Sequence, residues 1–449
     1  MTAAGEKLPS VGPAGPLVPP QPRLRLAAFE VPLYRWYFTA SWISSAGDGM
    51  ETVIRNLLVL RLAGDQAAFW LGIMVFAHWV PFTIFSLLGG TLADRYDLRK
   101  LQLVAQLLLF AAGLGVALVT IAGLVSVWWI FGFLLLHGFA GAIGNPAQQT
   151  LVHSIVGRER LLSAVSLNST SRQLSQVVGP AIAGLVFVAF GPGWGLLVNA
   201  LSFVPLLLLL TFMRLPRAEL RVPQAPLEAL REGLRFLRTR PRLTALIGVE
   251  MLPVVFLGHT FHSLLPLFAR DRLGADELGY SFLLVASGLG ALGAAVWLAY
   301  GRERADPLRI VVVAAAIEIA AILVFALTTS YPLALALMLA IGASGVIAQA
   351  LANTTLQLSA PDRIRGRVMG AYSFGTQGTR VVNGPLLGGL AQVFGPALAV
   401  AGSAALVLAA LGGILAALGR TDRRVRRGAP PDHLLRNDID QEDIASPSC

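Results

Sequence analysis

The sequence predicts an all-α membrane protein with about twelve transmembrane helices in two halves of six. Two observations predict this class. Of the 449 residues, 55% are hydrophobic and only 13% are charged, and the mean hydropathy is +0.68, whereas soluble chains carry about 25% charged residues. Apolar runs of about 20 residues, the length of one helical crossing, follow one another along the chain. They are continuous, which excludes barrel strands because those alternate apolar and polar residues.

Hydropathy places each crossing between polar or charged connections. In chain order we expect helices over 34–62, 69–89, 101–124, 127–149, 161–190, 196–213, 243–268, 278–300, 310–328, 332–356, 369–394 and 397–418. The first and the eleventh are the least apolar, since they carry several polar residues. The leader, residues 1–33, is rich in Pro and Gly and lacks the pattern of a cleavable secretory signal. It is expected to be a disordered tail.

Basic residues are distributed unevenly over the connections. One set of loops holds Arg95, Arg99, Lys100, Arg158, Arg160, Arg302, Arg304, Arg309, Arg363, Arg365 and Arg367, and the opposite set holds only Arg61, Arg270 and Arg272. The positive-inside rule places the first set and both termini in the cytoplasm of a cell with a bacterial-type membrane. This topology and contact with anionic lipids explain the net charge of +10, so no nucleic-acid partner is expected. Cys449 is the only cysteine, which excludes disulfides and thiolate metal sites.

The chain also repeats itself. A shift of the sequence by one constant offset aligns two similar stretches. It places on one another Thr150 and Thr355, Arg158 and Arg363, Arg160 and Arg365, Gly179 and Gly384, Pro180 and Pro385, and Gly184 and Gly389. Each stretch runs from the end of the fourth predicted helix of its half through the fifth. A parallel repeat of this kind predicts two six-helix halves, 34–213 and 243–418, joined by a linker, 214–242, and followed by a tail, 419–449.

The charged segment between the second and third predicted helices is the most specific motif. It contains Gly90, Asp94, Arg95, Arg99 and Lys100, and it closely resembles the cytoplasmic loop between helices 2 and 3 of major facilitator transporters. The resemblance implies the fold of that superfamily. It also implies a gate, in which these five residues close the cytoplasmic side. The segment departs from the superfamily pattern at Asp97 and Leu98, where Gly and Arg are usual.

The linker carries Leu227, Leu230, Leu234 and Leu237 on one helical face. An amphipathic helix on the inner membrane surface and a helix packed under the bundle both fit this pattern. The run 226–241 and the segments 45–48 and 94–97 resemble the branch that contains enterobactin exporters and macrolide-type proton antiporters. The resemblance covers 34 to about 420.

The first predicted helix has the densest group of polar side chains. Ser41, Ser45, Asp48, Thr52 and Arg55 form one stripe, and Glu51 can pair with Arg55 at i, i+4. Charge inside a membrane is costly and marks candidate sites. We expect Asp48 to be the proton-coupling residue, with Glu51 second and Glu250 of the seventh helix third. The alternative for Glu51 is a structural ion pair with Arg55.

The fifth and eleventh predicted helices repeat a polar stripe. Asn168, Arg172 and Ser175 precede Gly179 with the spacing by which Ser373, Gln377 and Arg380 precede Gly384. With Ser45, Thr52 and Arg55, we expect Asn168, Arg172, Ser175, Gln377 and Arg380 to line the substrate cavity, although Arg172 and Arg380 could instead pair with carboxylates. The small residues Gly179, Pro180, Gly184, Gly384, Pro385 and Gly389 predict close helix packing. The Gly-Pro-x-x-x-Gly element resembles the fifth-helix motif of drug and proton antiporters.

The sequence lacks a phosphate-binding loop and zincin spacing, so neither a primary pump, an enzyme nor a metal cofactor is predicted. These features favour proton-coupled efflux of a small amphiphilic molecule, drug or siderophore-like, by a monomer that alternates between two access states and uses the transmembrane proton gradient. The alternatives are a proton-linked nutrient importer and a non-transporting membrane sensor on the same fold.

Overall fold

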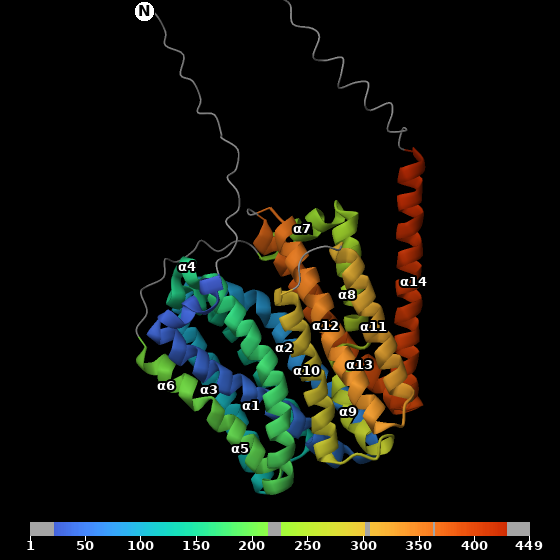
Figure 1. The fold of residues 1–449 in the computed structure, drawn as a ribbon. Coiled ribbons are helices and arrows are strands. Elements are labelled where there is room, and N and C mark those ends of the chain that lie inside the picture. The colour runs from blue at the N-terminus through green and yellow to red at the C-terminus, as the bar shows by residue number, and fades with distance from the viewer. Residues whose placement is uncertain (1–21, 214–225, 301–305, 362–363, 429–449) are drawn as a thin grey trace, which may run out of the picture.

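A bundle of long helices makes up the computed structural model, which describes residues 22–213, 226–300, 306–361 and 364–428 (Figure 1). The elements are η1 Pro22–Glu30, α1 Pro32–Ala63, η2 Gly64–Gln66, α2 Ala67–Arg95, α3 Leu98–Ile121, α4 Val127–Phe190, α5 Pro192–Ser202, α6 Val204–Phe212, α7 Pro226–Arg238, α8 Pro241–Phe256, α9 Gly258–Asp271, α10 Glu277–Tyr300, α11 Pro307–Leu327, α12 Tyr331–Ser359, α13 Arg365–Phe394 and α14 Pro396–Gly428. No strand occurs within these ranges. The predicted all-α class is confirmed.

Nine helical stretches in the described ranges are long and apolar enough to cross a membrane, and the bent pair α8–α9 makes a tenth if it is one span. One of the nine, Pro32–Phe85, contains α1 and most of α2. Helix α13, which carries Arg380, lies outside this set. The membrane-bundle architecture is therefore confirmed, and the number of twelve crossings stays a prediction.

Four predicted helices differ from the helices in the structure, and the glycines and prolines of the sequence account for the difference. The fourth and fifth predicted helices form α4, which is interrupted at Gly157 (φ 73°, ψ 175°), a conformation that glycine adopts at no steric cost. The sixth predicted helix is divided into α5 and α6 at Phe203. The seventh is divided into α8 and α9, which are bent by 43° beside Gly258 (φ 41°).

The internal repeat has a counterpart in backbone geometry. Gly191 ends α4 at φ 82° and Gly395 ends α13 at φ 84°. Each is followed by a proline at the first position of the next helix, where the missing N–H of proline is not needed. The two segments that the sequence aligns therefore end in the same kind of turn.

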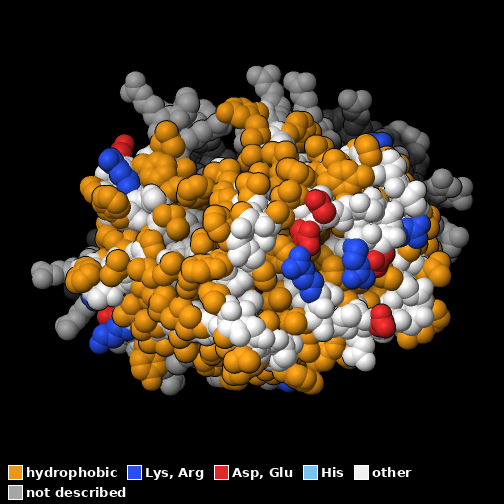
Figure 2. Space-filling view, turned by 90° about the horizontal axis from the view of Figure 1, so that it is seen from below, with side chains coloured by type: hydrophobic (Ala, Val, Ile, Leu, Met, Phe, Trp, Pro, Cys, Tyr) orange, Lys and Arg blue, Asp and Glu red, His pale blue; other side chains and the backbone are white. Residues whose placement is uncertain are grey.

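The two halves of the bundle meet along two equivalent helix pairs, α4 with α10 and α13 with α2. Additional contacts join them at the end where α1 stops and α10 starts. There Arg61 forms an ion pair with Glu277, and Gln392 donates to the carbonyl of Asp65. This end shows mainly apolar and uncharged side chains with a small group of charged ones (Figure 2). The predicted topology assigns it to the periplasm.

At the opposite end, α7 lies close to the start of α8 (Figure 1). Glu232 of α7 forms an ion pair with Arg367 of α13, and Leu237 is buried in a cluster with residues of α8 and α13. Gly233 lies against the backbone of Arg367. Of the two alternatives for the linker helix, the structure therefore has the helix packed under the bundle.

Candidate substrate and proton site

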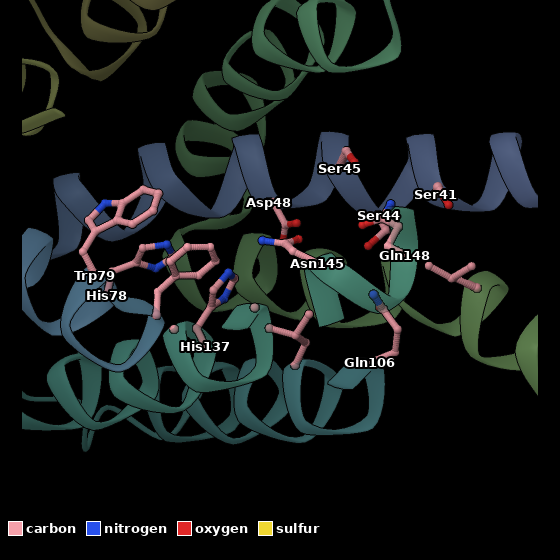
Figure 3. A pocket seen from close by; sticks show the side chains of 15 residues that line it. Ser41, Ser44, Ser45, Asp48, His78, Trp79, Gln106, His137, Asn145 and Gln148 are labelled. Carbon is pink, nitrogen blue, oxygen red and sulfur yellow. The ribbon is translucent and has the colours of Figure 1, made fainter. Parts of the chain in front are cut away.

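A polar cavity of about 190 Å³ lies inside the N-terminal half, between α1 and the helices α2, α3, α4 and α6. We call it the Asp48 pocket. Its lining is Ser41, Ser44, Ser45, Asp48, His78, Trp79, Phe82, Gln106, Leu109, His137, Gly138, Gly141, Asn145, Gln148 and Leu206. In Figure 3, Asp48 and Asn145 point toward each other across the pocket, and the two histidines lie side by side. The ring centroids of His78 and His137 are 5.0 Å apart.

Several polar atoms of this lining have no partner in the protein. They are Ser41 Oγ, Asp48 Oδ1, Gln106 Oε1 and His137 Nδ1, each buried and without a hydrogen bond within the described part of the chain. Buried polar atoms in proteins are nearly always satisfied by protein, water or ligand. A polar cavity lined by four unsatisfied atoms is therefore suited to hold water or the polar part of a ligand.

Sequence reasoning placed only Ser41, Ser45 and Asp48 in this neighbourhood. Gln106, His137, Asn145 and Gln148 were not among the predicted site residues, although Gln106 follows Gln102 by four residues and Gln148 follows Asn145 by three. The signal that could have found them is the rarity of such side chains inside membrane helices. It does not say which helices face one another.

The second carboxylate of α1 is engaged in an ion pair. Arg55 Nη1 lies 2.8 Å from Glu51 Oε1 and 2.7 Å from Oε2, and the Glu51 side chain is 3% exposed. The i, i+4 spacing places the two groups on one helix face. Glu51 therefore has its charge compensated locally, whereas Asp48 accepts no hydrogen bond at Oδ1.

A second polar group lies in the C-terminal half. Tyr372 of α13 donates a 2.7 Å hydrogen bond to Glu250 Oε1, and Glu250 Oε2 is buried without a partner. Arg380, two turns further along α13, stacks over Trp79 of α2, with its guanidinium carbon 4.4 Å from the ring centroid. The Arg380 side chain thus contacts the opposite half, while its Nε atom has no hydrogen-bond partner.

The other predicted cavity residues lie in varied surroundings. Thr52 is exposed and donates to the carbonyl of Asp48. Asn168 accepts from the Tyr34 hydroxyl of α1 at 3.2 Å. Arg172 is exposed, and Ser175 is buried with an unsatisfied hydroxyl. None of these four lines the Asp48 pocket. The side chain of Gln377 lies outside the described residues.

Part of the predicted gate falls outside the described residues as well, since the surroundings of Gly90 and the side chains of Asp94 and Arg95 belong to that part. Arg99 donates to the carbonyls of Leu210 and Thr211, both at 2.6 Å, at the C-terminal end of α6, where a cation is favoured. This contact lies within one half. The unusual Asp97 is the N-cap of α3, because its carboxylate accepts from the backbone N–H groups of Arg99 and Lys100. The Lys100 side chain is exposed.

The predicted packing residues make two kinds of helix contact, one within a half of the bundle and one between the halves. Gly179 lies against Gly49 of α1 in the same half, with Pro180 beside them. Gly184 lies against Ser281 of α10, and Gly384 against Gly72 of α2, so both make contacts between halves. Pro385 is accommodated inside α13. Gly389 faces open space, and its neighbour Gly388 makes the contact with Gly72 instead.

A family model described as transmembrane secretion effector matches residues 24–443 of this chain. The enterobactin exporter EntS of Shigella flexneri is 26% identical over 402 residues, which are 89% of this chain and 94% of the exporter. EntS of Escherichia coli O157:H7 is 26% identical over 403 residues, with the same coverage of both chains.

Solved structures of transporters share the fold. A POT family transporter in complex with 5-aminolevulinic acid has a TM-score of 0.67 at 14% identity and covers 86% of this chain and 95% of its own. The D-xylose-proton symporter has a TM-score of 0.65 at 14% identity, with 86% and 97% covered. The nucleoside transporter NupG has a TM-score of 0.65 at 14% identity, with 86% and 98% covered.

Proposed function

Because this chain belongs to the transmembrane secretion effector family of major facilitator transporters, we propose that it exports a small amphiphilic molecule by secondary active transport driven by entering protons. Two curated relatives of nearly the same length are exporters, which supports the outward direction. Support for proton coupling comes from residues of this chain, those of the Asp48 pocket.

One observation carries the coupling proposal. Asp48 lies inside the N-terminal half with an unsatisfied carboxylate oxygen, in a pocket lined by hydroxyl, amide and imidazole groups. An acid inside a membrane protein, without an ion-pair partner of its own, is a candidate for reversible protonation because its charge is costly there. Glu51 is a weaker candidate since Arg55 compensates its charge. Glu250 stays the alternative, since one of its oxygens is also unsatisfied.

Export by alternating access requires that proton and cargo bias the same equilibrium between two states of the bundle. The contacts between halves at Arg61–Glu277 and Gln392–Asp65 hold the predicted periplasmic end together. In this state, cargo would enter from the cytoplasm. Opening at the predicted periplasmic end requires that these contacts separate and that the pairs α2–α13 and α4–α10 part at that end while the bundle rocks about its middle.

The test uses purified protein in proteoliposomes with an imposed pH gradient and a panel of antibiotics and siderophores. Substrate-dependent proton movement is followed with an enclosed pH-sensitive dye. For a compound that the wild type exports uphill, Asp48→Asn should abolish uphill export and retain exchange without a gradient. Glu159→Gln, at an exposed residue of α4 outside the pocket, is the control and should export normally. Full gradient-driven export by Asp48→Asn would move the coupling role to Glu250, and normal export by Glu250→Gln as well would end the proton-antiport proposal.

A further inference from the structure

We propose that the Asp48 pocket binds a protonated amino group of the cargo, so that the transported molecule is an amine-bearing amphiphile. The inference rests on the proposed export function and adds the chemical class of the cargo. It follows from the charge, the hydrogen-bonding atoms, the size and the walls of the pocket.

The charge of the lining favours a cation. Among the described residues, Asp48 is the only carboxylate in the lining, and no Lys or Arg side chain belongs to it. Arg55, on the same helix, is compensated by Glu51, and Arg172 is exposed elsewhere on the bundle. An anionic group in this pocket would lose its water and meet a carboxylate, whereas an ammonium would meet a charge of opposite sign.

The unsatisfied atoms also favour a hydrogen-bond donor. Asp48 Oδ1 and Gln106 Oε1 are acceptors, and the hydroxyl of Ser41 can accept. Gln106 is 7% exposed, so its carbonyl has little access to bulk water. A primary ammonium donates three hydrogen bonds and accepts none. It would therefore satisfy acceptors that the protein leaves unpaired, without leaving an acceptor of its own unsatisfied.

The size and the walls indicate which part of the cargo fits. A cavity of about 190 Å³ is smaller than the roughly 300–1,000 Å³ of pockets for drug-sized ligands. It can hold a head group with a short stem. Trp79 and Phe82 form an aromatic wall, with ring centroids 5.3 Å apart. The Arg380 guanidinium lies over the Trp79 ring, so this wall is an apolar surface for the stem beside the amino group. The apolar remainder of the cargo would lie outside the pocket.

Placing the amine at Asp48 gives exchange with protons a direct physical cause. The charged and titratable groups around Asp48 are Glu51 and Arg55 on α1, His78 on α2 and His137 on α4, and Arg380 of α13 lies over Trp79 of the lining. Since Glu51 and Arg55 compensate each other, Asp48 is the one anion of the pocket available to a cation. A proton on Asp48 would remove that anion, so proton and ammonium compete for one carboxylate.

The test uses the full-length protein in detergent and three probes that share one ring. Benzylamine is a cation, benzyl alcohol is uncharged and benzoate is an anion, and binding of each is measured by saturation-transfer NMR and isothermal titration. We expect benzylamine to bind wild-type protein about tenfold more tightly than the other two, the size of one charge-assisted hydrogen bond. Asp48→Asn should remove this preference, Asp48→Glu should restore it, and the exposed Glu159→Gln should leave it unchanged. A second variant, Gln106→Leu, should weaken benzylamine binding severalfold without altering benzoate.

Equal binding of the three probes, benzylamine binding that Asp48→Asn does not alter, or no benzylamine binding at millimolar concentration would each overturn the inference. Thermal unfolding of every variant shows whether it is folded, and a misfolded Asp48→Asn leaves the decision to Gln106→Leu and to the probe series on wild type.

The proposed function fails in a different way. Amine binding without gradient-driven transport refutes proton-coupled export alone, and export of uncharged cargo without amine binding refutes only the cargo class.

Discussion

The ion pair between Arg61 and Glu277 is expected to hold the two halves together at the predicted periplasmic end. Arg61 Nη2 lies 2.5 Å from Glu277 Oε1, at the end of α1 and the start of α10. The Arg61 guanidinium also stacks on Phe187, with 4.5 Å between its carbon and the ring centroid. Phe187 belongs to the same half as Arg61. Glu277→Gln therefore removes the link between halves and keeps the cation–π contact.

The size of the effect of Glu277→Gln follows from the exposure of the two paired side chains. The Arg61 and Glu277 side chains are 53% and 33% exposed, and exposed ion pairs contribute about 0.2–1 kcal/mol. At about 1.4 kcal/mol for each factor of ten, this shifts the equilibrium toward the state open at this end by about 1.4- to 5-fold. The buried hydrogen bond from Asn56 to Tyr280 (3.2 Å) also joins the halves nearby and is retained in the variant.

The assay measures how fast a cysteine between the halves reacts with a membrane-impermeant maleimide. Ser281 is 2% exposed and lies against Gly184 of the opposite half, so Ser281→Cys in a Cys449→Ser background reports separation of α10 from α4. Glu277→Gln should raise the labelling rate by the factor above. Asp271→Asn is the matched control, because it breaks the similarly exposed Arg270–Asp271 pair within one half. An unchanged rate in Glu277→Gln, or an equal rise in Asp271→Asn, would refute the reasoning.

Three further outcomes are expected. Arg55→Ala alone should lower the thermal stability of the purified protein by an amount equivalent to about 3–5 kcal/mol, because it strands the buried Glu51 charge. The double variant with Glu51→Ala should recover most of this loss, and equal losses in the two variants would show that the pair is not coupled. Gly384→Leu should lower the free energy of unfolding by about 1–3 kcal/mol and block transport, since a side chain there would overlap the Gly72 carbonyl. Gly389→Leu, at a glycine that faces open space, should do neither, and a functional Gly384→Leu protein would contradict the close contact. An alkaline phosphatase fusion after residue 217 should be inactive and a green fluorescent protein fusion there should fluoresce, and the reverse pattern would overturn the predicted orientation.

The sequence by itself determined the features that depend on local order along the chain. Continuous apolar runs predict membrane helices, and the i, i+4 spacing predicts the Glu51–Arg55 pair that the structure contains. Resemblance of the residues 90–100 to a known loop predicted the superfamily. Each of these depends on residues that are neighbours in the chain or on one helix face.

The tertiary structure decided which polar faces meet. The Asp48 pocket combines side chains from five helices, among them Gln106, His137 and Asn145, and no local pattern joins them. The same holds for Arg172 and Arg380, which were both predicted to line the substrate cavity although one is exposed and the other stacks on Trp79. The physical reason is that a membrane helix is apolar on most faces, because lipid and protein neighbours are equally apolar, so its periodicity does not reveal its partners. Packing of small residues, as at Gly72 and Gly384, sets the rotation of each helix and thereby brings isolated polar residues together in one cavity.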